Sequence, residues 1–447
     1  MPKPHSSWRC QQCGHAAARW LGRCPECGEY GTFAEEAQAP QRTGGSSAVG
    51  TARPVTSLAD VTLSPEMRFP TGIGELDTVL GGGLVRGSAV LIGGEPGIGK
   101  STLLLQAAGT LGGRGVPVLY VCGEESAQQV RARADRVGAS DGIMLLPEVD
   151  AAAIEATVLA ERPQVVIVDS VQTLFDPGLD GVPGSVGQVR ATAARLVRMA
   201  KTHDVTLILV GHVTKDGTIS GPRVLEHVVD TVLYFEGDAD HAFRIVRAAK
   251  NRFGSVSDIG IFEMTGDGLA EVGQPSSALL AGRAGGVAGS AVMATMEGSR
   301  PLLVEVQALV TPTYLQVPRR LSVGIENARL LQVLAILERR ADVGLGTYDV
   351  YVSVAGGVRV TEPAVDLPLA LALASSRSDR PLPADAVAFG EVGLTGDVRG
   401  VPHAEARLRE AARMGFSRSF GPELKGISAP GHVAVRSLSD ALERAFG

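Results

Sequence analysis

Residues 94–101 read GEPGIGKS, and their types and spacing match a loop that binds nucleotide phosphates. The stretch follows the apolar run AVLIGG and opens the helix-like run STLLLQAAGTL, which gives the motif the strand–loop–helix setting it needs. Backbone N–H groups of such a loop cradle the phosphates together with the helix N-terminus, while Lys100 neutralises phosphate charge and Ser101 binds Mg²⁺. The predicted nucleotide-binding residues of this stretch are Gly94, Glu95, Pro96, Gly97, Ile98, Gly99, Lys100, Ser101 and Thr102.

Acidic residues and a histidine end three other strand-like runs. Asp169 ends VVIVDS, where an aspartate can hold Mg²⁺ through water or serve only as a turn cap. Glu124 and Glu125 follow VLYVC, where a carboxylate can orient and deprotonate the attacking water; we favour Glu124, although a solvated acidic loop is the alternative. His212, in LILVGHVTK, could sense the γ-phosphate or act as a neutral cap.

Four cysteines lie within the first 27 residues, in the pattern CQQC, ten residues, CPEC. Four thiolates at this spacing can close a tetrahedron around Zn²⁺ with bonds of about 2.3 Å, and a site with four cysteine ligands is structural. A redox pair is the alternative. The predicted ligands are Cys10, Cys13, Cys24 and Cys27. Nearby residues could contact nucleic acid or another protein: Trp8, Arg9, Arg19, Trp20 and Arg23.

The stretch KNRFG begins at residue 250, after the strand-like run HAFRIVRAA. Its two cations, Lys250 and Arg252, are suited to an anion, whereas for five isolated residues a solvated turn is the simpler interpretation.

The elements that must position these residues form an α/β chain. Short β-branched runs alternate with helical patterns from about residue 58 to 274, which predicts a mainly parallel sheet covered on both faces. The expected organisation is a four-cysteine zinc finger (1–33), a flexible linker rich in Ala, Gly, Ser, Thr and Pro (34–57), the phosphate-loop domain (58–274) and a second α/β domain (275–447).

Length and composition are those of an ordinary globular protein. The chain has 447 residues, 45% of them hydrophobic and 20% charged, and a formal net charge of -6, which excludes a uniformly basic nucleic-acid binder but not local basic patches. The N-terminus lacks the apolar core of a signal peptide, and no apolar run approaches the roughly 18 to 20 residues that cross a bilayer. We therefore expect a cytoplasmic protein with no membrane contact.

Together, GIGELDTVLGGGL, GEPGIGKST, CGEES, VVIVDS, GHVTKDGTISGPRVLEH and KNRFG, behind four cysteines, closely resemble the bacterial RadA (Sms) recombination and repair family. The resemblance implies a RecA-like P-loop ATPase that uses ATP, Mg²⁺ and Zn²⁺. It also implies a homo-oligomeric, hexameric ring that acts on single-stranded and branched DNA, with the recombinase RecA as partner. The implied activity is DNA-stimulated and helicase-like, and promotes branch migration. In this family KNRFG acts from the neighbouring subunit, so Lys250 and Arg252 would reach the next protomer's ATP and stabilise charge in the transition state.

In RecA-like rings, loops that follow the strands face DNA in the pore. The Gly-rich segments DPGLDGVPGSVGQVR and TKDGTISGPR occupy such positions, and Lys215 and Arg223 are the cations expected to meet backbone phosphates. Ordinary surface loops are the alternative.

Residues from about 280 resemble the proteolytic domain of Lon, as in SVGIENARL, VYVSVAGGVRVTEPAVDLPLALALAS and FGEVGLTGDVRGVPHAEARLREA. The serine and lysine positions of Lon fall on or near Asp366 and Glu405, and no lysine lies between Lys250 and Lys425. We therefore expect an assembly platform without a catalytic dyad. Its outer face could bind DNA through Arg399, Arg407, Arg409 and Arg413, although a solvated helix surface explains them equally well. The alternative functions are a KaiC-like signalling or scaffold ATPase and, less favoured, an ATP-dependent protease.

Overall fold

A computed structural model of the chain describes residues 6–10, 15–17, 19–37, 68–139, 141–212, 222–237, 243–424, 426–427 and 429–447. The chain divides into two compact units. The first contains Met1–Glu236, Val246–Val256 and Thr265–Leu269, and the second contains Gly237–Ile245, Ser257–Met264 and Ala270–Gly447. Within the described ranges, no helix is long and apolar enough to cross a membrane.

The cysteine-rich N-terminal segment forms a small antiparallel sheet in the order β2-β1-β3. Its strands are β1 (Ser6–Cys10), β2 (Ala16–Ala17) and β3 (Phe33–Ala37). Cys10, Cys24 and Phe33 are buried at its centre. Strand β3 continues past residue 33, where composition placed the start of a linker, because Ala34 to Ala37 pair with β1. Composition alone does not reveal this pairing.

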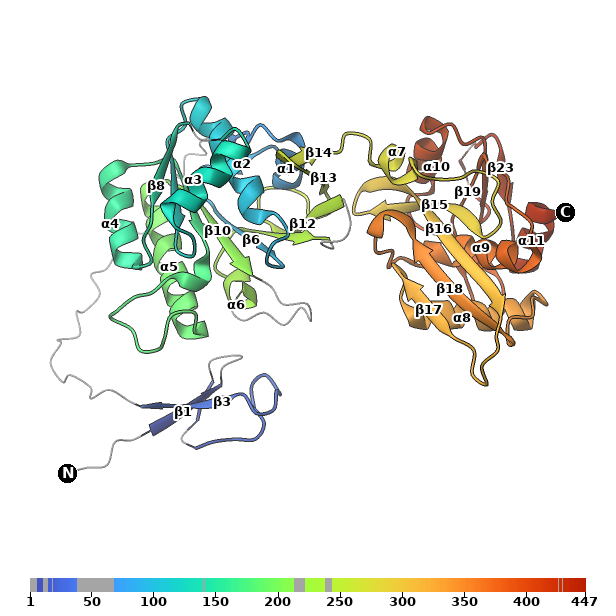
Figure 1. Ribbon diagram of the computed structural model, residues 1–447, viewed down its shortest axis with the longest axis horizontal. Helices are drawn as coiled ribbons and strands as arrows, with labels where there is room; N and C mark the ends of the chain where they lie inside the picture. Colours follow the sequence, from blue (N-terminus) through green and yellow to red (C-terminus); the bar gives the residue numbers. More distant parts are fainter. Residues whose placement is uncertain are drawn as a thin grey trace. The chain divides into compact units, whose positions relative to one another are not determined.

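A nine-stranded sheet carries the phosphate loop, in the order β14-β13-β12-β11-β6-β10-β9-β7-β8 (Figure 1). Neighbouring strands run parallel from β11 to β8. The strands are β6 (Ala89–Gly94), β7 (Val118–Cys122), β8 (Ile143–Leu146), β9 (Val165–Asp169), β10 (Thr206–His212), β11 (Thr231–Glu236), β12 (Phe243–Asn251), β13 (Ile259–Thr265) and β14 (Gly268–Glu271). The central parallel strands are buried along almost their whole length, so they appear in the sequence as unbroken aliphatic runs.

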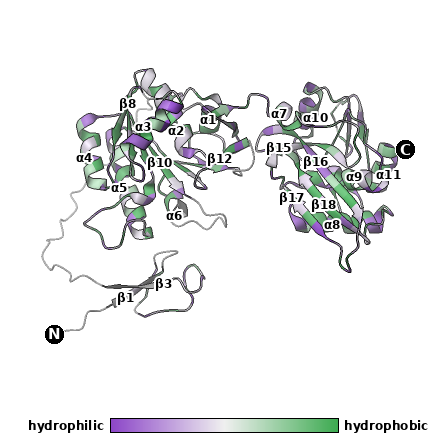
Figure 2. Ribbon diagram, viewed as in Figure 1, coloured by the Kyte–Doolittle hydropathy of each residue, from purple (hydrophilic) through white to green (hydrophobic). Residues whose placement is uncertain are grey.

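Helices cover both faces of this sheet. The helices are α1 (Gly74–Leu80), α2 (Lys100–Gly113), α3 (Ala127–Arg136), α4 (Ala151–Glu161), α5 (Val186–His203) and α6 (Pro222–Glu226), and a short ribbon pairs β4 (Arg68–Phe69) with β5 (Leu84–Val85). Val166 and Val168 belong to the apolar cluster formed with α4 and α5. Ile167, between them in β9, meets side chains of α1 and α2 on the opposite face. Apolar residues accordingly concentrate along the strands and the sheet-facing sides of the helices (Figure 2).

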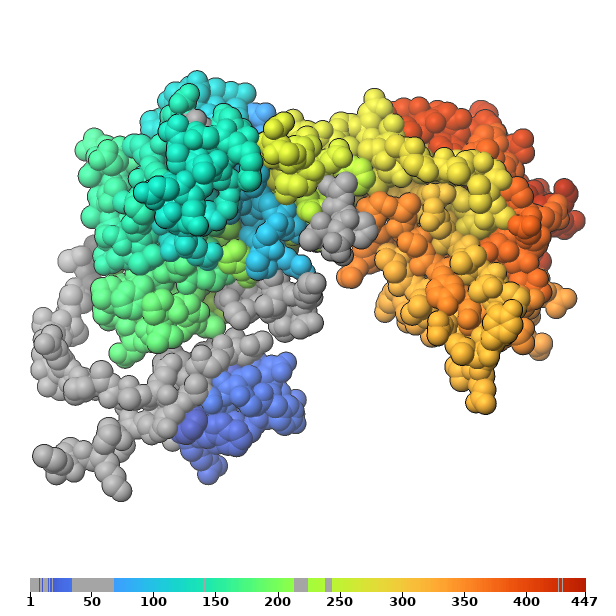
Figure 3. Space-filling view, viewed as in Figure 1, coloured from blue at the N-terminus to red at the C-terminus, as the bar shows by residue number. Residues whose placement is uncertain are grey.

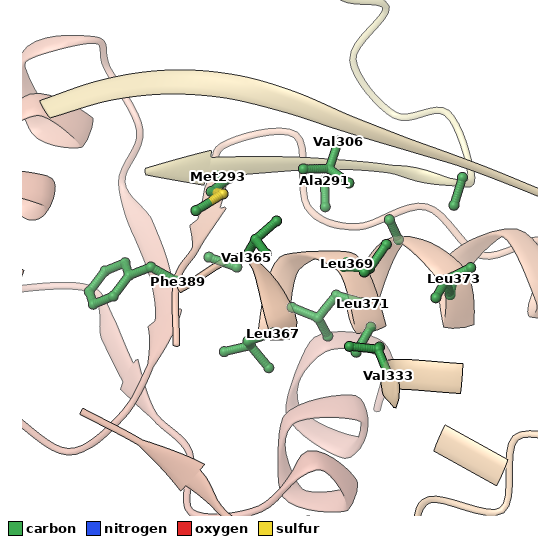
Figure 4. Packing of buried hydrophobic residues seen from close by; sticks show 14 of the residues in the cluster. Ala291, Met293, Val306, Val333, Val365, Leu367, Leu369, Leu371, Leu373 and Phe389 are labelled. Carbon is green, nitrogen blue, oxygen red and sulfur yellow. The ribbon is translucent and has the colours of Figure 1, made fainter. Parts of the chain in front are cut away.

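The second unit has a mixed sheet in the order β17-β18-β16-β15-β19-β22-β23. Its elements are α7 (Pro275–Leu280), β15 (Ser290–Glu297), β16 (Arg300–Pro312), β17 (Arg320–Val323), α8 (Asn327–Arg340), β18 (Tyr348–Val354), α9 (Asp366–Ser378), β19 (Ala386–Ala388), β20 (Glu391–Val392), β21 (Val398–Arg399), α10 (Ala404–Arg413), β22 (Arg418–Gly421), β23 (His432–Ala434) and α11 (Leu438–Phe446). Helix α9 is buried from Asp366 to Ser375. Its leucines meet the sheet and α8 in one core, as Leu369, Leu371 and Val333 illustrate (Figure 4).

The loop of residues 313–319, between β16 and β17, projects from the second unit (Figure 3). Tyr314 in this loop is 99% exposed. Leu309 of β16 and Leu321 of the edge strand β17 both pair with Tyr351 of β18, so the three share one row across the sheet, and both leucines are exposed. This sheet face is therefore more apolar than an ordinary solvated surface.

The topology confirms the predicted class: a mixed α/β chain with a cysteine-rich N-terminal block, a mainly parallel sheet that carries the phosphate loop, and a second mixed sheet. The domain boundaries drawn from composition, and the likeness of residues 275–447 to Lon, stay predictions.

Candidate functional site

The phosphate loop links the end of β6 to the start of α2. Gly97 and Gly99 have φ values of 77° and 116°, a backbone conformation that favours glycine. A Cβ on Gly94 would lie 2.7 Å from the carbonyl oxygen of Phe235, so only glycine fits between β6 and β11. The loop therefore needs its glycines for its shape as well as for a close approach to phosphate.

Lys100 begins α2 and is 3% exposed. Its ammonium group donates hydrogen bonds to the carbonyl oxygens of Gly94 (2.8 Å) and Glu95 (2.7 Å). Burial lowers its pKa from 10.5 to about 8, and the nearby charges of Asp169, Glu124 and Glu95 oppose the shift. The cation is thus close to both strand-end acids predicted for this site.

Asp169 ends β9, and its carboxylate is held by a tyrosine. Tyr120 of β7 donates its hydroxyl hydrogen to Oδ2 of Asp169 at 2.6 Å. Burial, and then the charge of Asp169, raise the pKa of Tyr120 well above 10, so the hydroxyl stays protonated. A carboxylate at the end of a parallel strand, beside a phosphate loop, has the chemistry to hold Mg²⁺ through water.

The two adjacent glutamates after β7 have different surroundings. Glu124 accepts a hydrogen bond from the Ser170 hydroxyl, and its carboxylate lies 3.4 Å from Nε2 of His212. Glu125 instead pairs with Arg133 of α3. A Cβ on Gly123 would lie 2.1 Å from the Thr173 hydroxyl, so glycine lets this loop approach the end of β9. Glu124 is thereby the glutamate that lies among the other strand-end residues, next to Ser170 and His212.

His212 ends β10, in register with Gly94 of β6. Its Nδ1 is buried and has no hydrogen-bond partner among the residues that the structure describes. The parallel strands therefore bring Lys100, Asp169, Glu124 and His212 to one edge of the sheet.

Lys250 and Arg252 lie near the other end of the parallel strands, where β6 begins. Lys250 donates to the carbonyl oxygens of Glu226 (2.7 Å) and Val229 (2.8 Å). Arg252, whose side chain is 58% exposed, contacts Oδ1 of Asp230 at 3.2 Å. Burial, and then the neighbouring Arg252, lower the pKa of Lys250.

The buried Asp230 marks where this cluster lies. Its backbone N–H donates to the carbonyl of Ala89 and its Oδ2 accepts from the Ala89 N–H, so it sits at the first residue of β6. Lys201 also contacts its Oδ1, at 2.8 Å. The phosphate loop begins at the other end of β6, about 16 Å further along the strand at roughly 3.3 Å per residue. Within one chain, Lys100 of the phosphate loop is therefore not brought together with Lys250 and Arg252.

The two cations predicted to bind DNA cannot be placed fully. Lys215 lies outside the described residues. Arg223 belongs to α6, directly after the undescribed residues 213–221, and its side chain is likewise outside the description.

Three of the four predicted zinc ligands converge. The Sγ atoms of Cys10, Cys24 and Cys27 all lie within 4.8 Å of one another, and Cys10 and Cys27 are 3.7 Å apart. Cys13 lies outside the described residues. Three clustered thiols are suited to a soft ion with tetrahedral coordination, such as Zn²⁺.

The Lon-like positions in the second unit hold no nucleophile–lysine pair. Asp366 is buried and contacts Arg329 at 2.8 Å, and burial raises its pKa. Glu405 is exposed and pairs with Arg409 on the same helix. The hydroxyl oxygens of Ser375 and Ser376, near the end of α9, accept hydrogen bonds from the backbone N–H groups of Gly289 and Val310, respectively.

The expectation that Arg407 lies on an outer DNA-binding face is wrong. Arg407 is 1% exposed and forms a two-pronged pair with Glu362, with a further hydrogen bond to the carbonyl of Ala294. Arg399, Arg409 and Arg413 are exposed or half-buried, and each pairs with an acid on its own or a neighbouring segment.

Three residues that contact predicted site residues were not predicted from the sequence: Tyr120, Ser170 and Asp230. A tyrosine inside an otherwise aliphatic strand needs a partner for its hydroxyl, which was an available signal. Asp230 is an isolated acid directly before the apolar run TVLYF, a comparable signal. Their partners lie far away in the sequence and could not have been named.

Two family models match the chain. An AAA domain matches residues 59–218, and a rubredoxin metal binding domain matches residues 8–35, which include all four predicted zinc ligands. The phosphate loop lies within the first match.

Three relatives match along nearly the whole chain, and each is named DNA repair protein RadA. The protein of Bacillus subtilis (strain 168) is 46% identical over 458 residues and that of Pseudomonas aeruginosa 49% identical over 453, with 100% of both chains covered in each case. That of Brucella abortus is 48% identical over 436 residues, covering 95% of this chain and 93% of the relative. A solved structure of a KaiC-like protein of Pyrococcus horikoshii matches 46% of this chain and 100% of its own chain at 21% identity, with a TM-score of 0.39.

Proposed function

The chain belongs to the family of DNA repair protein RadA, and from that membership we propose that it hydrolyses ATP, with DNA as the stimulus, while it processes recombination intermediates. In this proposal it forms a ring, with a hexamer expected, moves on single-stranded and branched DNA, and promotes branch migration beside the recombinase RecA. The AAA domain supports ATP hydrolysis, and the name of the relatives, DNA repair protein, supports DNA as the substrate.

One observation carries the proposal that subunits share nucleotide sites. Arg252 lies beside Asp230 at the start of β6, whereas the phosphate loop follows the end of β6. If Arg252 serves a nucleotide, that nucleotide belongs to another subunit. A cation supplied from a neighbour stabilises charge on the transferring phosphoryl group and is worth roughly 10³ to 10⁵ in rate. Hydrolysis then depends on assembly.

The proposed roles within one subunit follow the contacts at the other edge. Lys100 binds the phosphates, and Ser101 and Asp169 would hold Mg²⁺, which neutralises phosphate charge when bound. Glu124 takes the proton of the attacking water. Its carboxylate accepts a hydrogen bond from Ser170 and lies 3.4 Å from Nε2 of His212. Because His212 leads directly into residues 213–221, we propose that the segment carrying Lys215 and Arg223 contacts DNA and transmits its presence to the site.

For the second unit we propose assembly rather than proteolysis. The buried Asp366 and the exposed Glu405 support this role, because neither acid can replace a serine or a lysine in peptide cleavage. The exposed row of Leu309 and Leu321 also supports it, since contiguous exposed apolar side chains are typical of protein contacts.

The test is steady-state ATP hydrolysis with and without single-stranded DNA, for the native protein and Arg252→Ala. We expect strong stimulation in the native protein and a loss of at least about 10³ in the variant, with ATP binding retained. Arg131→Ala is the matched control, because Arg131 is similarly exposed and pairs with Asp135 on its own helix. If DNA does not stimulate the native protein, the signalling ATPase is favoured. If Arg252→Ala keeps full activity, KNRFG is a surface turn with no role in hydrolysis.

A further inference from the structure

Tyr120 is a buried residue to which the proposed mechanism assigns no role. It lies in β7, is 1% exposed, and interrupts an otherwise aliphatic or small run, VLYVC. A tyrosine in this position costs folding energy unless its hydroxyl is hydrogen-bonded, because burying a polar group without a partner is unfavourable. Phenylalanine would fill a buried position of this shape without that requirement, so the hydroxyl needs an explanation.

The strand register explains how the hydroxyl reaches the end of the neighbouring strand. Tyr120 pairs with Ile167 of β9, and Cys122 pairs with Asp169. Side chains two residues apart on a strand share a face, so Tyr120 and Asp169 are diagonal neighbours on one face of the sheet. Aromatic side chains are long enough to span such a diagonal. The hydroxyl meets Oδ2 of Asp169 at 2.6 Å.

The hydrogen bond from Tyr120 restricts the orientation of the Asp169 carboxylate. The phenol hydroxyl of Tyr120 donates to a carboxylate oxygen of Asp169 at 2.6 Å, and such charge-assisted hydrogen bonds are short and strong. Among the described residues, Tyr120 is the side chain that hydrogen-bonds to this carboxylate, and it engages one oxygen. The bond fixes the rotation of the carboxylate and leaves the other oxygen, Oδ1, for a ligand at the strand end.

We propose that Tyr120 is a positioning residue that orients Asp169 toward the Mg²⁺ of a bound nucleotide. This inference rests on the proposed metal role of Asp169. Groups that hydrogen-bond to metal-binding carboxylates orient them, and their removal typically costs 10- to 100-fold in metal affinity or activity. Because Asp169 would act through water, we place the effect of Tyr120 at the lower end, at about tenfold.

The test measures binding rather than turnover. The affinity of a fluorescent ADP is determined with Mg²⁺ and in Mg²⁺-free buffer for the native protein, Tyr120→Phe and Asp169→Asn, and the ratio of the two affinities gives the enhancement by Mg²⁺. We expect Tyr120→Phe to bind ADP normally without Mg²⁺ and to lose about tenfold of the enhancement. A loss of affinity that is equal with and without Mg²⁺ would indicate a merely structural role and overturn the inference.

Tyr234→Phe is the matched control. Tyr234 lies in β11 of the same sheet, and its hydroxyl donates to Oε1 of Glu226 at 2.7 Å, so the variant also removes a tyrosine–carboxylate hydrogen bond. Its Mg²⁺ enhancement should equal that of the native protein, and its melting temperature shows what loss of such a bond costs. Equal loss of enhancement in both tyrosine variants would overturn a specific role for Tyr120.

Asp169→Asn separates this inference from the function on which it rests. If Asp169→Asn keeps the enhancement, the proposed metal role of Asp169 fails, and the role of Tyr120 fails with it. If Asp169→Asn loses the enhancement while Tyr120→Phe keeps it, only the role of Tyr120 is overturned.

Discussion

At Lys100, a cation is held where little water reaches it. Its ammonium protons go to two backbone carbonyls of the phosphate loop, and burial lowers its pKa to about 8. A charge in such a place opposes folding but favours an anionic ligand, because phosphate oxygens restore what water would have supplied. The loop is therefore built for ligand binding at the expense of stability.

Removal of this charge should stabilise the protein measured without nucleotide. The folded-state pKa of about 8 lies below the ordinary 10.5, so the native protein gains stability as pH rises from about 8 to 10.5. Lys100→Met lacks the charge, so we expect it to be more stable at pH 7 by about 1–3 kcal/mol and to lose that advantage as the pH rises. Urea-dependent hydrogen exchange of β6 and α2, at about pH 7 and pH 9.5, measures both differences. A less stable variant at pH 7 would show that the two carbonyl hydrogen bonds outweigh the cost of the buried charge.

Single residues also show where sequence reasoning stops. The strand–loop–helix setting of GEPGIGKS could be predicted because the motif depends on a local spacing. Glu124 and Glu125 could not be separated in this way, because the difference depends on Arg133, eight positions later, and on Ser170 from another strand. Tyr120 and Asp169 are 49 positions apart, so their contact depends on a strand register that the sequence does not state.

At the level of elements, buried parallel strands were predictable and the second unit's helix surfaces were less so. Strand ends converge on one edge whatever the detailed register, so the motifs sufficed to group Lys100, Asp169 and His212. Helix α10 reads AEARLREAAR, which suggests a solvated arginine face. Arg407 is buried nonetheless, because Glu362 and the carbonyl of Ala294 satisfy its guanidinium. Glu362 lies 45 positions earlier in the sequence, so the pair could not be predicted from the helix alone.

Arg407 and Arg409, on the same helix, allow a matched comparison. Arg407→Ala leaves the carboxylate of Glu362 without its charged partner, so we expect a loss of about 3–5 kcal/mol. Arg409→Ala removes an exposed pair with Glu405 and should cost less than about 0.5 kcal/mol. Hydrogen exchange of α10 and β15 against denaturant reports this unit separately. Equal stabilities of the two variants would contradict the buried pair.

The same pair predicts a pH dependence. Burial raises the pKa of Glu362. The hydrogen bonds and positive charge of Arg407 lower it, as do the hydrogen bonds from the Thr295 hydroxyl and the Met296 N–H. These effects outweigh burial, so the pKa lies below 4.5. The stability that the pair provides is thus present above the ordinary pKa of 4.5 and is lost as pH falls through the lower folded value. The difference between Arg407→Ala and the native protein should shrink in the same direction.

At the scale of the molecule, Lys100 lies at one edge of the sheet, and Lys250 and Arg252 lie at the opposite edge. A head-to-tail contact, in which the Arg252 edge of one subunit faces the phosphate loop of the next, uses both, and repetition of this contact closes a ring when the rotation allows. Asp230 then has two functions: it holds Arg252 in one position and ties the start of β6 to Lys201 of α5. The proposed ring and the proposed trans-acting arginine are therefore one hypothesis.

Mixed assemblies test that hypothesis directly. Lys100→Ala lacks a working phosphate loop but keeps Arg252, and Arg252→Ala keeps the loop but lacks the arginine, so neither variant should hydrolyse ATP alone. In an equal mixture that assembles at random, about a quarter of the head-to-tail contacts join an intact loop to an intact arginine. DNA-stimulated hydrolysis should thus recover to about a quarter of the native rate, provided that co-expression has allowed the two chains to mix. If co-purified mixed assemblies remain as inactive as the separate variants, each site is complete within its own chain, and the position of Arg252 beside Asp230 serves folding alone.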